Sequence, residues 1–289
     1  MTAIGLLSPW PGIGWRKPRG RRLRQARTTE ESLRRSDSES VSIVLDLRDI
    51  LAPSTEQVRG ENGIELVDGP AVVVTGAMRG ADAPGADGPA NLVAAIRTAS
   101  APAARGLGVL VVLNDEIHSA RRVEKMHTAL PSAFTSPGSG PLGLVAENEA
   151  VISTMPVRKP VLAPLLPAFA PVAMVKVGLG DDGRAFGHVE SAGYRGLVLE
   201  AIGAGHVPAD VLSPLSSLAE RMPVILTTRV AAGPVFTSTY GFPGSEISLI
   251  AAGLIPSGHL RAPKARLLLS VLIGNGWTRE QIRESFAAC

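Results

Sequence analysis

The sequence has very little of several features that define whole classes of proteins. It contains a single cysteine, Cys289, at the end of its 289 residues. One thiol cannot form a disulfide within the chain and cannot supply the four thiolates of a zinc ribbon. The disulfide-rich secreted class is therefore excluded, and a reducing cytoplasm is the simplest expected location.

Long uninterrupted apolar runs are also missing. The longest apolar stretch, residues 160–177, is broken by four prolines, and it falls short of the roughly 20 residues that a membrane-spanning helix needs. We therefore expect no membrane span. Hydrophobic residues nevertheless make up 45% of the chain, enough to bury cores, and the length suggests about two domains.

Basic charge is concentrated in one short segment. Residues 16–27 hold seven basic and no acidic residues, and without them the chain has 22 basic against 26 acidic residues. Such a segment can contact nucleic acid or an anionic surface. Because no aromatic residues are interleaved with the charges, we favour a disordered basic arm over residues 1–40 and do not expect nucleic acid or membrane partners.

From residue 41 onward, short β-branched runs alternate with helical patterns between glycines and prolines. This is typical of α/β proteins with parallel sheets. Residues 71–75 and 107–113 read as buried strands, and residues 89–99 between them read as a helix with a proline in its first turn. We place a first domain at residues 41–154.

A proline-rich stretch, residues 155–170, is the expected linker, since prolines stiffen a connection. The pattern then begins again in a smaller α/β domain, residues 171–289. Its expected strands are 172–177, 196–200 and 223–227, and its expected helices are 208–220, 244–252, 263–272 and 278–287. The last helix has Thr278 and Gln281 at capping-box spacing.

A Gly178-x-Gly180-x-x-Gly183 motif follows the first strand of the second domain and outlines a dinucleotide-binding loop. However, Asp181 and Asp182 would place two negative charges beside the pyrophosphate. An ordinary Gly-Asp turn at the end of a strand is the favoured interpretation.

A cluster of polar residues follows the strand at residues 107–113, at the end where open α/β sheets bind ligands. Asn114, Asp115 and Glu116 lead into a long polar connection that contains His118, Lys125 and His127. The two histidines lack a metal-binding spacing, so we expect no metal site. Lys125, if partly desolvated beside a hydroxyl, could act as a base, although a surface ion pair is the alternative for any single lysine.

Several ordered motifs resemble the bacterial L-asparaginase family. In the first domain they are Thr75-Gly76-Ala77-Met78-Arg79, Ala86-Asp87-Gly88-Pro89-x-Asn91-Leu92, the run from Asn114 to Thr128, and Ser136-Pro137-x-x-Gly140-Pro141-Leu142-Gly143. In the second they are Ala192-Gly193-Tyr194-x-Gly196, Gly203-x-Gly205-His206, Thr228-Arg229-Val230, Tyr240-Gly241-x-Pro243-Gly244-Ser245-Glu246 and Lys264-Ala265-Arg266.

The resemblance implies two α/β domains, the first flavodoxin-like, in a homodimer or homotetramer with active sites between subunits. It implies hydrolysis of L-asparagine to L-aspartate and ammonia through a covalent intermediate on a threonine, without a cofactor. Lys125 matches the lysine of a Thr-Lys-Asp triad. Ala77 matches a position whose backbone lies near the substrate amide, Glu246 matches an acidic residue that reaches the substrate ammonium, and His206 stands beside that site where some members have asparagine.

The resemblance stops short of the family's two catalytic threonine motifs, Thr-Gly-Gly-Thr and His-Gly-Thr-Asp-Thr, neither of which occurs before residue 71. We therefore expect an incomplete first domain and impaired activity, because loss of triad members costs orders of magnitude in rate. A replacement nucleophile, if there is one, would be Ser54, Thr55 or Thr75. The alternative is a catalytically inactive relative that binds a small amino acid or serves as an assembly module.

Overall fold

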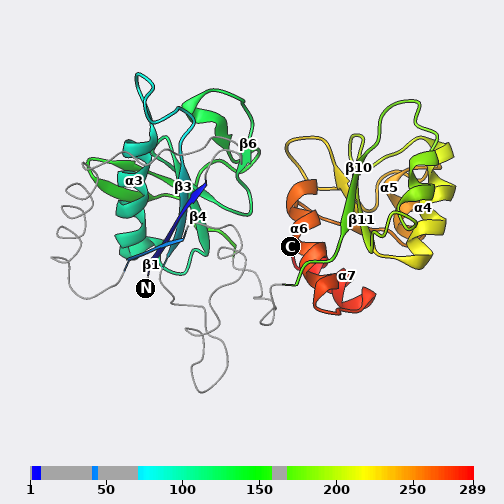
Figure 1. Cartoon of the computed structure of the whole chain (residues 1–289). Coiled ribbons are helices and arrows are strands. Elements are labelled where there is room, and N and C mark those ends of the chain that lie inside the picture. The colour runs from blue at the N-terminus through cyan, green and yellow to red at the C-terminus, as the bar shows by residue number, and fades with distance from the viewer. Residues whose placement is uncertain (1, 8–40, 45–70, 158–167) are drawn as a thin grey trace, which may run out of the picture. The chain divides into compact units, whose positions relative to one another are not determined.

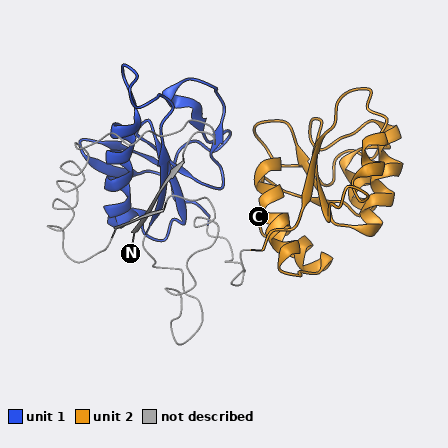
Figure 2. Cartoon of the chain, viewed as in Figure 1, with its two compact units in different colours: residues 1–157 blue, residues 158–289 orange. Residues whose placement is uncertain are grey.

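The computed structural model describes residues 2–7, 41–44, 71–157 and 168–289 (Figure 1). The chain divides into two compact units, Met1–Val157 and Arg158–Cys289 (Figure 2). Each unit combines helices with a parallel or mixed sheet, so the expected two-domain α/β fold is confirmed. Most of the expected proline-rich linker, residues 158–167, lies outside the described residues.

Unit 1 is built on a seven-stranded mixed sheet with the strand order β2-β1-β3-β4-β5-β8-β9. The first four of these strands in that order pair in parallel, and the remaining pairings are antiparallel. The strands are β1 (Thr2–Leu7), β2 (Val41–Val44), β3 (Val72–Gly76), β4 (Val109–Leu113), β5 (Glu116–Ser119), β8 (Gly143–Ala146) and β9 (Glu149–Ile152).

Strand β1 differs from the expected disordered arm over residues 1–40. Thr2–Leu7 lies between β2 and β3, with Ala3 opposite Val72 and Leu7 opposite Gly76. The physical reason is local composition, because this uncharged run is followed only later by the basic residues. The basic segment itself, residues 16–27, lies outside the described residues.

Helix α3 (Gly88–Ser100) packs on this sheet and begins with Pro89 in its first turn. Its buried face carries small residues, including Ala94, Ala95 and Ala99, which pack with Val73 and Leu110 of the strands. Small side chains on the helix let it lie close to the β-branched strands. The expected strand–helix–strand crossover is present, with bounds shifted by one or two residues.

Strands β4 and β5 are joined by a tight turn rather than by the long polar loop that we expected. Asn114 and Asp115 have positive φ angles of 51° and 60°, which a two-residue hairpin turn requires and which asparagine and aspartate tolerate. The chain therefore reverses into an antiparallel strand and buries His118. A second small hairpin follows, formed by β6 (Glu124–Lys125) and β7 (Phe134–Thr135).

Unit 2 has a four-stranded parallel sheet in the order β10-β11-β12-β13. Helices lie on both of its faces, and each face has its own apolar core. The strands are β10 (Val172–Lys176), β11 (Gly196–Ala201), β12 (Val224–Thr228) and β13 (Ile255–Pro256), and the helices are α4 (Ala209–Arg221), α5 (Glu246–Ala251), α6 (Ala262–Gly274) and α7 (Arg279–Ala287).

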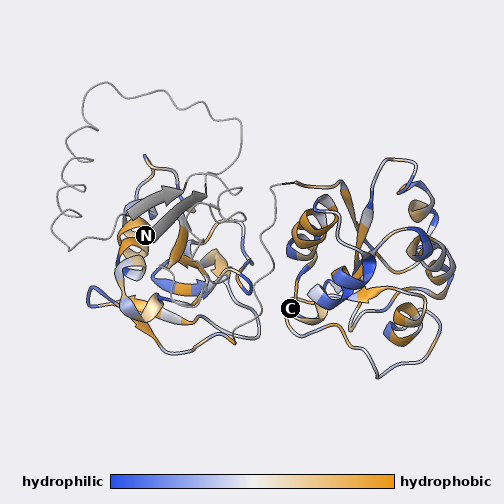
Figure 3. Ribbon diagram, turned by 90° about the horizontal axis from the view of Figure 1, so that it is seen from below, coloured by the Kyte–Doolittle hydropathy of each residue, from blue (hydrophilic) through white to orange (hydrophobic). Residues whose placement is uncertain are grey.

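Helix α4 shows how the sequence pattern places its buried face. Val211, Leu215 and Leu218 are three or four positions apart and are fully or almost fully buried, as one stripe of an amphipathic helix should be. Figure 3 shows the helices of this unit with both hydrophilic and hydrophobic residues along their length, as expected for helices with one face in the core. At α7 the capping box is confirmed, with Thr278 and Gln281 bonding reciprocally.

The glycine-rich segment after β10 forms the expected Gly-Asp turn. The Asp181 carboxylate accepts the Gly178 amide N–H at 2.6 Å, and Gly180 and Gly183 have positive φ angles. A short 3₁₀ helix, η3 (Arg184–His188), follows. No helix among the described residues is long and apolar enough to cross a membrane.

Candidate functional site

In unit 1, the loop after β3 is held by one carboxylate. Asp87 accepts the backbone N–H groups of Met78 and Arg79, with shortest distances of 2.9 and 2.8 Å. It also accepts the side-chain amide of Asn91 at 3.1 Å. We call this arrangement the Asp87–Asn91 brace.

The environment of the brace keeps Asp87 ionised. Burial by itself raises the pKa of this carboxyl, but the N–H donors of Met78 and Arg79 and the Asn91 amide stabilise the charged form. The net result is a pKa below the usual value for aspartate. Asp87 is therefore a permanent acceptor near neutral pH.

Asn91 extends the brace to two strand ends. Its amide nitrogen donates to the Gly76 carbonyl at 2.9 Å, and its oxygen accepts the Asn114 N–H at 2.9 Å. Gly76 ends β3 and Asn114 follows β4, so one side chain on α3 connects the carboxyl ends of both strands. Ala77, which lies between Gly76 and the first amide bound by Asp87, is thereby held in a fixed loop.

Thr75, one of the candidate nucleophiles, is unsuited to that role. It is fully buried, and its hydroxyl donates to the Val112 carbonyl at 2.6 Å. A nucleophile needs both access to substrate and a base for its proton. The other two candidates, Ser54 and Thr55, lie outside the described residues.

Lys125 lies on the β6–β7 hairpin and is exposed rather than partly desolvated. Its Nζ is 5.8 Å from the centre of the Phe134 ring on the paired strand, within the range of a cation–π contact. The hairpin rests on the sheet through Val123, which packs with Val74 and Val111. Within the described part of the chain, the Lys125 ammonium has no hydroxyl or carboxylate partner.

His118 is the fully buried polar group beneath this hairpin. Its Nδ1 is 3.0 Å from the Ser136 hydroxyl, and its Nε2 is 3.2 Å from a Glu116 carboxylate oxygen, although at an angle too poor for a good hydrogen bond. Burial lowers the pKa of His118, and the nearby Glu116 charge opposes this only in part. A neutral His118 thus connects β5 to Ser136, the residue that follows β7.

The second histidine of this region, His127, has a local structural role. Its Nδ1 accepts the backbone N–H groups of Ala129 and Leu130 at 3.0 and 3.1 Å. Among the described residues, no group of three or more metal-ligating side chains comes together.

In unit 2, Glu246 and His206 lie in contact, although they are 40 residues apart in sequence. Glu246 is the first residue of α5, after the N-cap Ser245, and it is 0% exposed. One carboxylate oxygen accepts the backbone N–H groups of Thr239 and Tyr240 at 2.9 and 2.7 Å. The other lies 3.0 Å from His206 Nε2.

These contacts fix the charge of Glu246. Burial raises its pKa, but the backbone donors of Tyr240 and Thr239, together with His206, outweigh burial and leave the pKa below the usual value. A position at a helix N-terminus also favours a negative charge. The result is an ionised carboxylate that is preformed without any ligand.

The His206 ring is positioned by the turn that carries it and by two aromatic rings. The turn starts at Gly203 and passes through Gly205, where any side chain would meet Val235 at 2.9 Å. Tyr240 and Phe242 approach the imidazole edge-on, with ring centres 5.0 and 5.2 Å away. Both aromatic side chains are almost half exposed.

Of the four residues singled out from the sequence, the structure therefore brings together two, His206 and Glu246. Ala77 and Lys125 lie in unit 1, on the braced loop and on the small hairpin. Sequence reasoning assigned no role to Asp87 and Asn91. The available signal was their spacing of four residues at the start of a helix, immediately after the glycine-containing loop.

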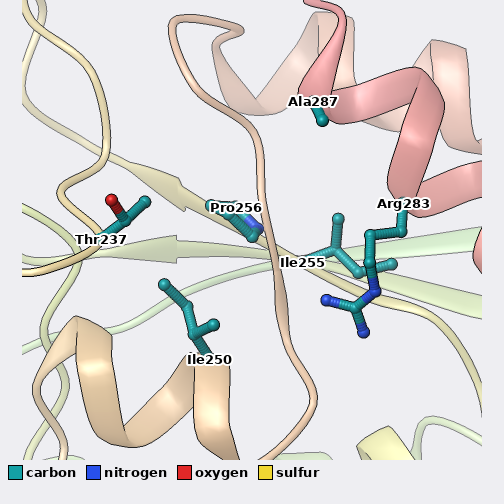
Figure 4. A pocket seen from close by; sticks show the side chains of 6 residues that line it. All are labelled: Thr237, Ile250, Ile255, Pro256, Arg283 and Ala287. Carbon is teal, nitrogen blue, oxygen red and sulfur yellow. The ribbon is translucent and has the colours of Figure 1, made fainter.

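A shallow hollow in unit 2, about 230 Å³ in volume, contains none of these residues (Figure 4). It is mostly apolar, and Arg283 is its one charged lining residue. The lining residues are Thr237, Ile250, Ile255, Pro256, Arg283 and Ala287.

Comparison with known proteins matches both units to one family. The asparaginase N-terminal family model matches residues 66–158, and the glutaminase/asparaginase C-terminal domain matches residues 171–286. A probable L-asparaginase of Deinococcus radiodurans is 39% identical over 223 residues, which cover 74% of this chain and 66% of that protein. L-asparaginase 2 of Escherichia coli is 31% identical over 222 residues, covering 74% and 62%.

A solved structure, a probable cytoplasmic L-asparaginase from Campylobacter jejuni, superposes with a TM-score of 0.71 at 27% identity. The match covers 92% of this chain and 83% of that one. Compared with its curated relatives, the chain spans about two thirds of their length or less. With both family domains matched in order along its two units, the chain belongs to the asparaginase family.

Proposed function

We propose that this chain is an asparaginase-family amidohydrolase that recognises L-asparagine or a related small amide, with hydrolysis at or near background. The observation that carries the recognition is the ionised, preformed Glu246 carboxylate beside His206. An amino acid presents an ammonium group, and a fixed negative charge in a desolvated site attracts it strongly. The relative whose name calls it cytoplasmic supports a cytoplasmic location, and the family resemblance implies a homodimer or homotetramer.

The expected residue roles follow the resemblance. The backbone at Ala77 would contact the side-chain amide of the substrate, and the Asp87–Asn91 brace holds that loop in place. Lys125 would handle the proton of an attacking hydroxyl. Low activity is supported by the exposed Lys125, which has no hydroxyl partner within the described residues, and by the two missing threonine motifs.

The test is ammonia release from L-asparagine by the full chain, compared with Lys125→Ala. We expect both proteins to be at or near background, because a base without a nucleophile does little. Robust turnover that disappears in the variant would contradict low activity and would point to Ser54 or Thr55 as the nucleophile. Arg121→Ala, which changes a neighbouring cation, is the matched control.

A second candidate function is that of a non-catalytic amino-acid-binding or assembly module. The exposed Lys125 favours it, since the catalytic centre would then be unused while the Glu246 site remains intact. Binding of L-aspartate without ammonia release would support the binding module, and oligomerisation without binding would support the assembly module.

A further inference from the structure

One buried contact closes the base of the small hairpin in unit 1. The chain leaves the seven-stranded sheet after β5, runs through β6 and β7, and returns to the sheet at β8. We call residues 120–135, which carry both hairpin strands and Lys125, the hairpin segment. His118 on β5 lies just before this segment and Ser136 just after it, and His118 Nδ1 is 3.0 Å from the Ser136 hydroxyl oxygen. The contact therefore joins the two ends of the segment.

The hairpin segment itself buries little. Val123 and Ala133 are its only buried residues, and the pairing of β6 with β7 joins two residue pairs. Val123 packs with Val74 and Val111 of the sheet. A segment with so few buried apolar contacts opens locally at a low cost in free energy. The contact at its base is therefore important for keeping it closed.

The hydrogen position on His118 follows from its two neighbours. A Glu116 carboxylate oxygen lies 3.2 Å from His118 Nε2, and an ionised carboxylate repels a bare lone pair, so Nε2 carries the hydrogen. In the neutral ring Nδ1 is then the acceptor of the Ser136 hydroxyl. The contact from Nε2 to Glu116 is poorly aligned, and the Glu116 side chain is 41% exposed. The carboxylate therefore compensates a positive charge on the ring only in part.

A proton on His118 Nδ1 disturbs this arrangement in two ways. Nδ1 becomes a donor, so the Ser136 hydroxyl has to turn its hydrogen away, and within the described residues that hydroxyl makes no other hydrogen bond. A charged ring is also costly where the side chain is 0% exposed. Burial accordingly lowers the pKa of His118, and the Glu116 charge opposes this in part. Both effects favour an open segment in which the imidazolium is hydrated.

We propose that His118 is a positioning residue for Lys125: in its neutral form it holds the hairpin segment closed on the sheet, and protonation releases the segment. Lys125 is then held in place at neutral and alkaline pH and set free under acid. The inference does not depend on the proposed function, because it concerns the hairpin segment with no ligand bound.

Few charged groups surround the imidazole. The strands β4, β7 and β8 and residues 136–142 carry no titratable side chain. Among the described residues, Glu116 is the one whose charge acts on His118. His127 is the one other histidine of the hairpin segment. The remaining titratable side chains on the turns and the strand next to β5 are Asp115, Arg121, Arg122, Glu124 and Lys125.

The direction of the pH response follows from proton linkage. The closed segment keeps His118 neutral to a lower pH than the open segment does, so the open state binds more protons below the ordinary histidine pKa of about 6.5. The equilibrium constant for opening then rises by up to about tenfold per pH unit as the pH falls below that value. The rise ends once the pH is below the lowered pKa of the closed state.

The experiment is hydrogen exchange of the full chain from pH 5 to pH 8, followed by mass spectrometry and corrected for the intrinsic pH dependence of exchange. Wild type is compared with His118→Asn, whose amide oxygen can accept the Ser136 hydroxyl without titrating, and with the control His127→Asn. We expect the hairpin segment of wild type and His127→Asn to open more under acid, by up to about tenfold per pH unit, while peptides from β4 stay protected. His118→Asn should give a flat profile.

Two further readouts keep the test decisive if His118→Asn folds poorly. A side-chain nitrogen NMR spectrum of wild type at pH 8 should show the Nε2–H tautomer of His118. Ser136→Ala should increase opening of the hairpin segment at pH 8 by roughly two- to tenfold, as expected for the loss of one hydrogen bond.

Four results would overturn the assignment: a flat wild-type profile, the same acid response in His118→Asn, opening of β4 together with the hairpin segment, or a Nδ1–H tautomer. An acid response that disappears in His127→Asn would assign the effect to the wrong histidine and would overturn it as well. Each of these results leaves amino-acid binding at Glu246 untouched, so failure of this inference and failure of the proposed function are distinguishable.

Discussion

Asp87 in unit 1 and Glu246 in unit 2 are held by the same pattern of backbone hydrogen bonds but have different side-chain partners. Each carboxylate accepts two consecutive backbone N–H groups, from Met78 and Arg79 in one case and from Thr239 and Tyr240 in the other. The remaining acceptor capacity of Asp87 goes to the Asn91 amide, which does not titrate, whereas that of Glu246 goes to a histidine. The two carboxylates therefore differ in their third partner, which is an amide in unit 1 and an imidazole in unit 2.

The largest expected effect concerns the independence of the two units. Residues 168–289 contain a complete parallel sheet with an apolar core on each face, and a unit of this size is well within the range of autonomous domains. We expect this fragment to unfold cooperatively on its own in urea, as followed by circular dichroism. The full chain should show an earlier, less stable phase from unit 1.

One coincident transition in the full chain, together with an unfolded fragment, would contradict this independence. It would mean that unit 1 is better formed than its missing threonine motifs suggest. In that case the Asp87–Asn91 brace and the Glu246 site would belong to one cooperatively unfolding structure.

A smaller effect is expected for Asp87→Ala, which removes the acceptor for Met78, Arg79 and Asn91. Hydrogen bonds to a charged group contribute roughly 1.5–3 kcal/mol each when removal leaves partners unsatisfied, and partial exposure of the loop to water keeps the total near the low end. We expect the free energy of unfolding of unit 1 to fall by about 2 kcal/mol. Asp82→Ala, an exposed neighbour in the same loop, should change it little.

The lowered pKa values of Asp87 and Glu246 predict how the free energy of unfolding changes at acid pH. Because the folded-state pKa values of Asp87 and Glu246 both lie below their usual values, each carboxylate contributes stability that is present above the unfolded pKa of about 4. That stability is lost as the pH falls through the folded pKa. Asp87→Ala should therefore flatten the acid side of the stability profile, and an unchanged profile would argue against the brace.

Particular residues show why the sequence predicted some of the fold and not the rest. The strands β11 and β12 were predicted because runs of β-branched and leucine residues are typical of strands buried on both faces, and almost all of their residues are buried. Strand β1 was assigned to an arm because the nearby basic segment dominated the composition. The turn at Asn114 and Asp115 was interpreted as a ligand loop, since the same residue types serve both in ligand sites and at positive φ.

The site was predictable only in part for a similar reason. His206 and Glu246 are far apart in sequence, and only the family resemblance indicated that they share a site, while their hydrogen bond required the three-dimensional structure. The exposure of Lys125 also depends on packing, because Val123 and Phe134 pack the hairpin that carries it against Val74 and Val111 of the sheet. Local patterns cannot show which side of such a hairpin faces solvent.

The central claim is that the Glu246–His206 pair of unit 2 recognises an amino acid through the buried Glu246 carboxylate. The most direct test is calorimetric titration of L-aspartate at pH 8 into wild type, Glu246→Gln and Asp82→Ala. We predict saturable binding by wild type and Asp82→Ala, and a loss of at least tenfold in Glu246→Gln, as expected when a buried charge is removed. Equal affinity in wild type and Glu246→Gln would contradict the account.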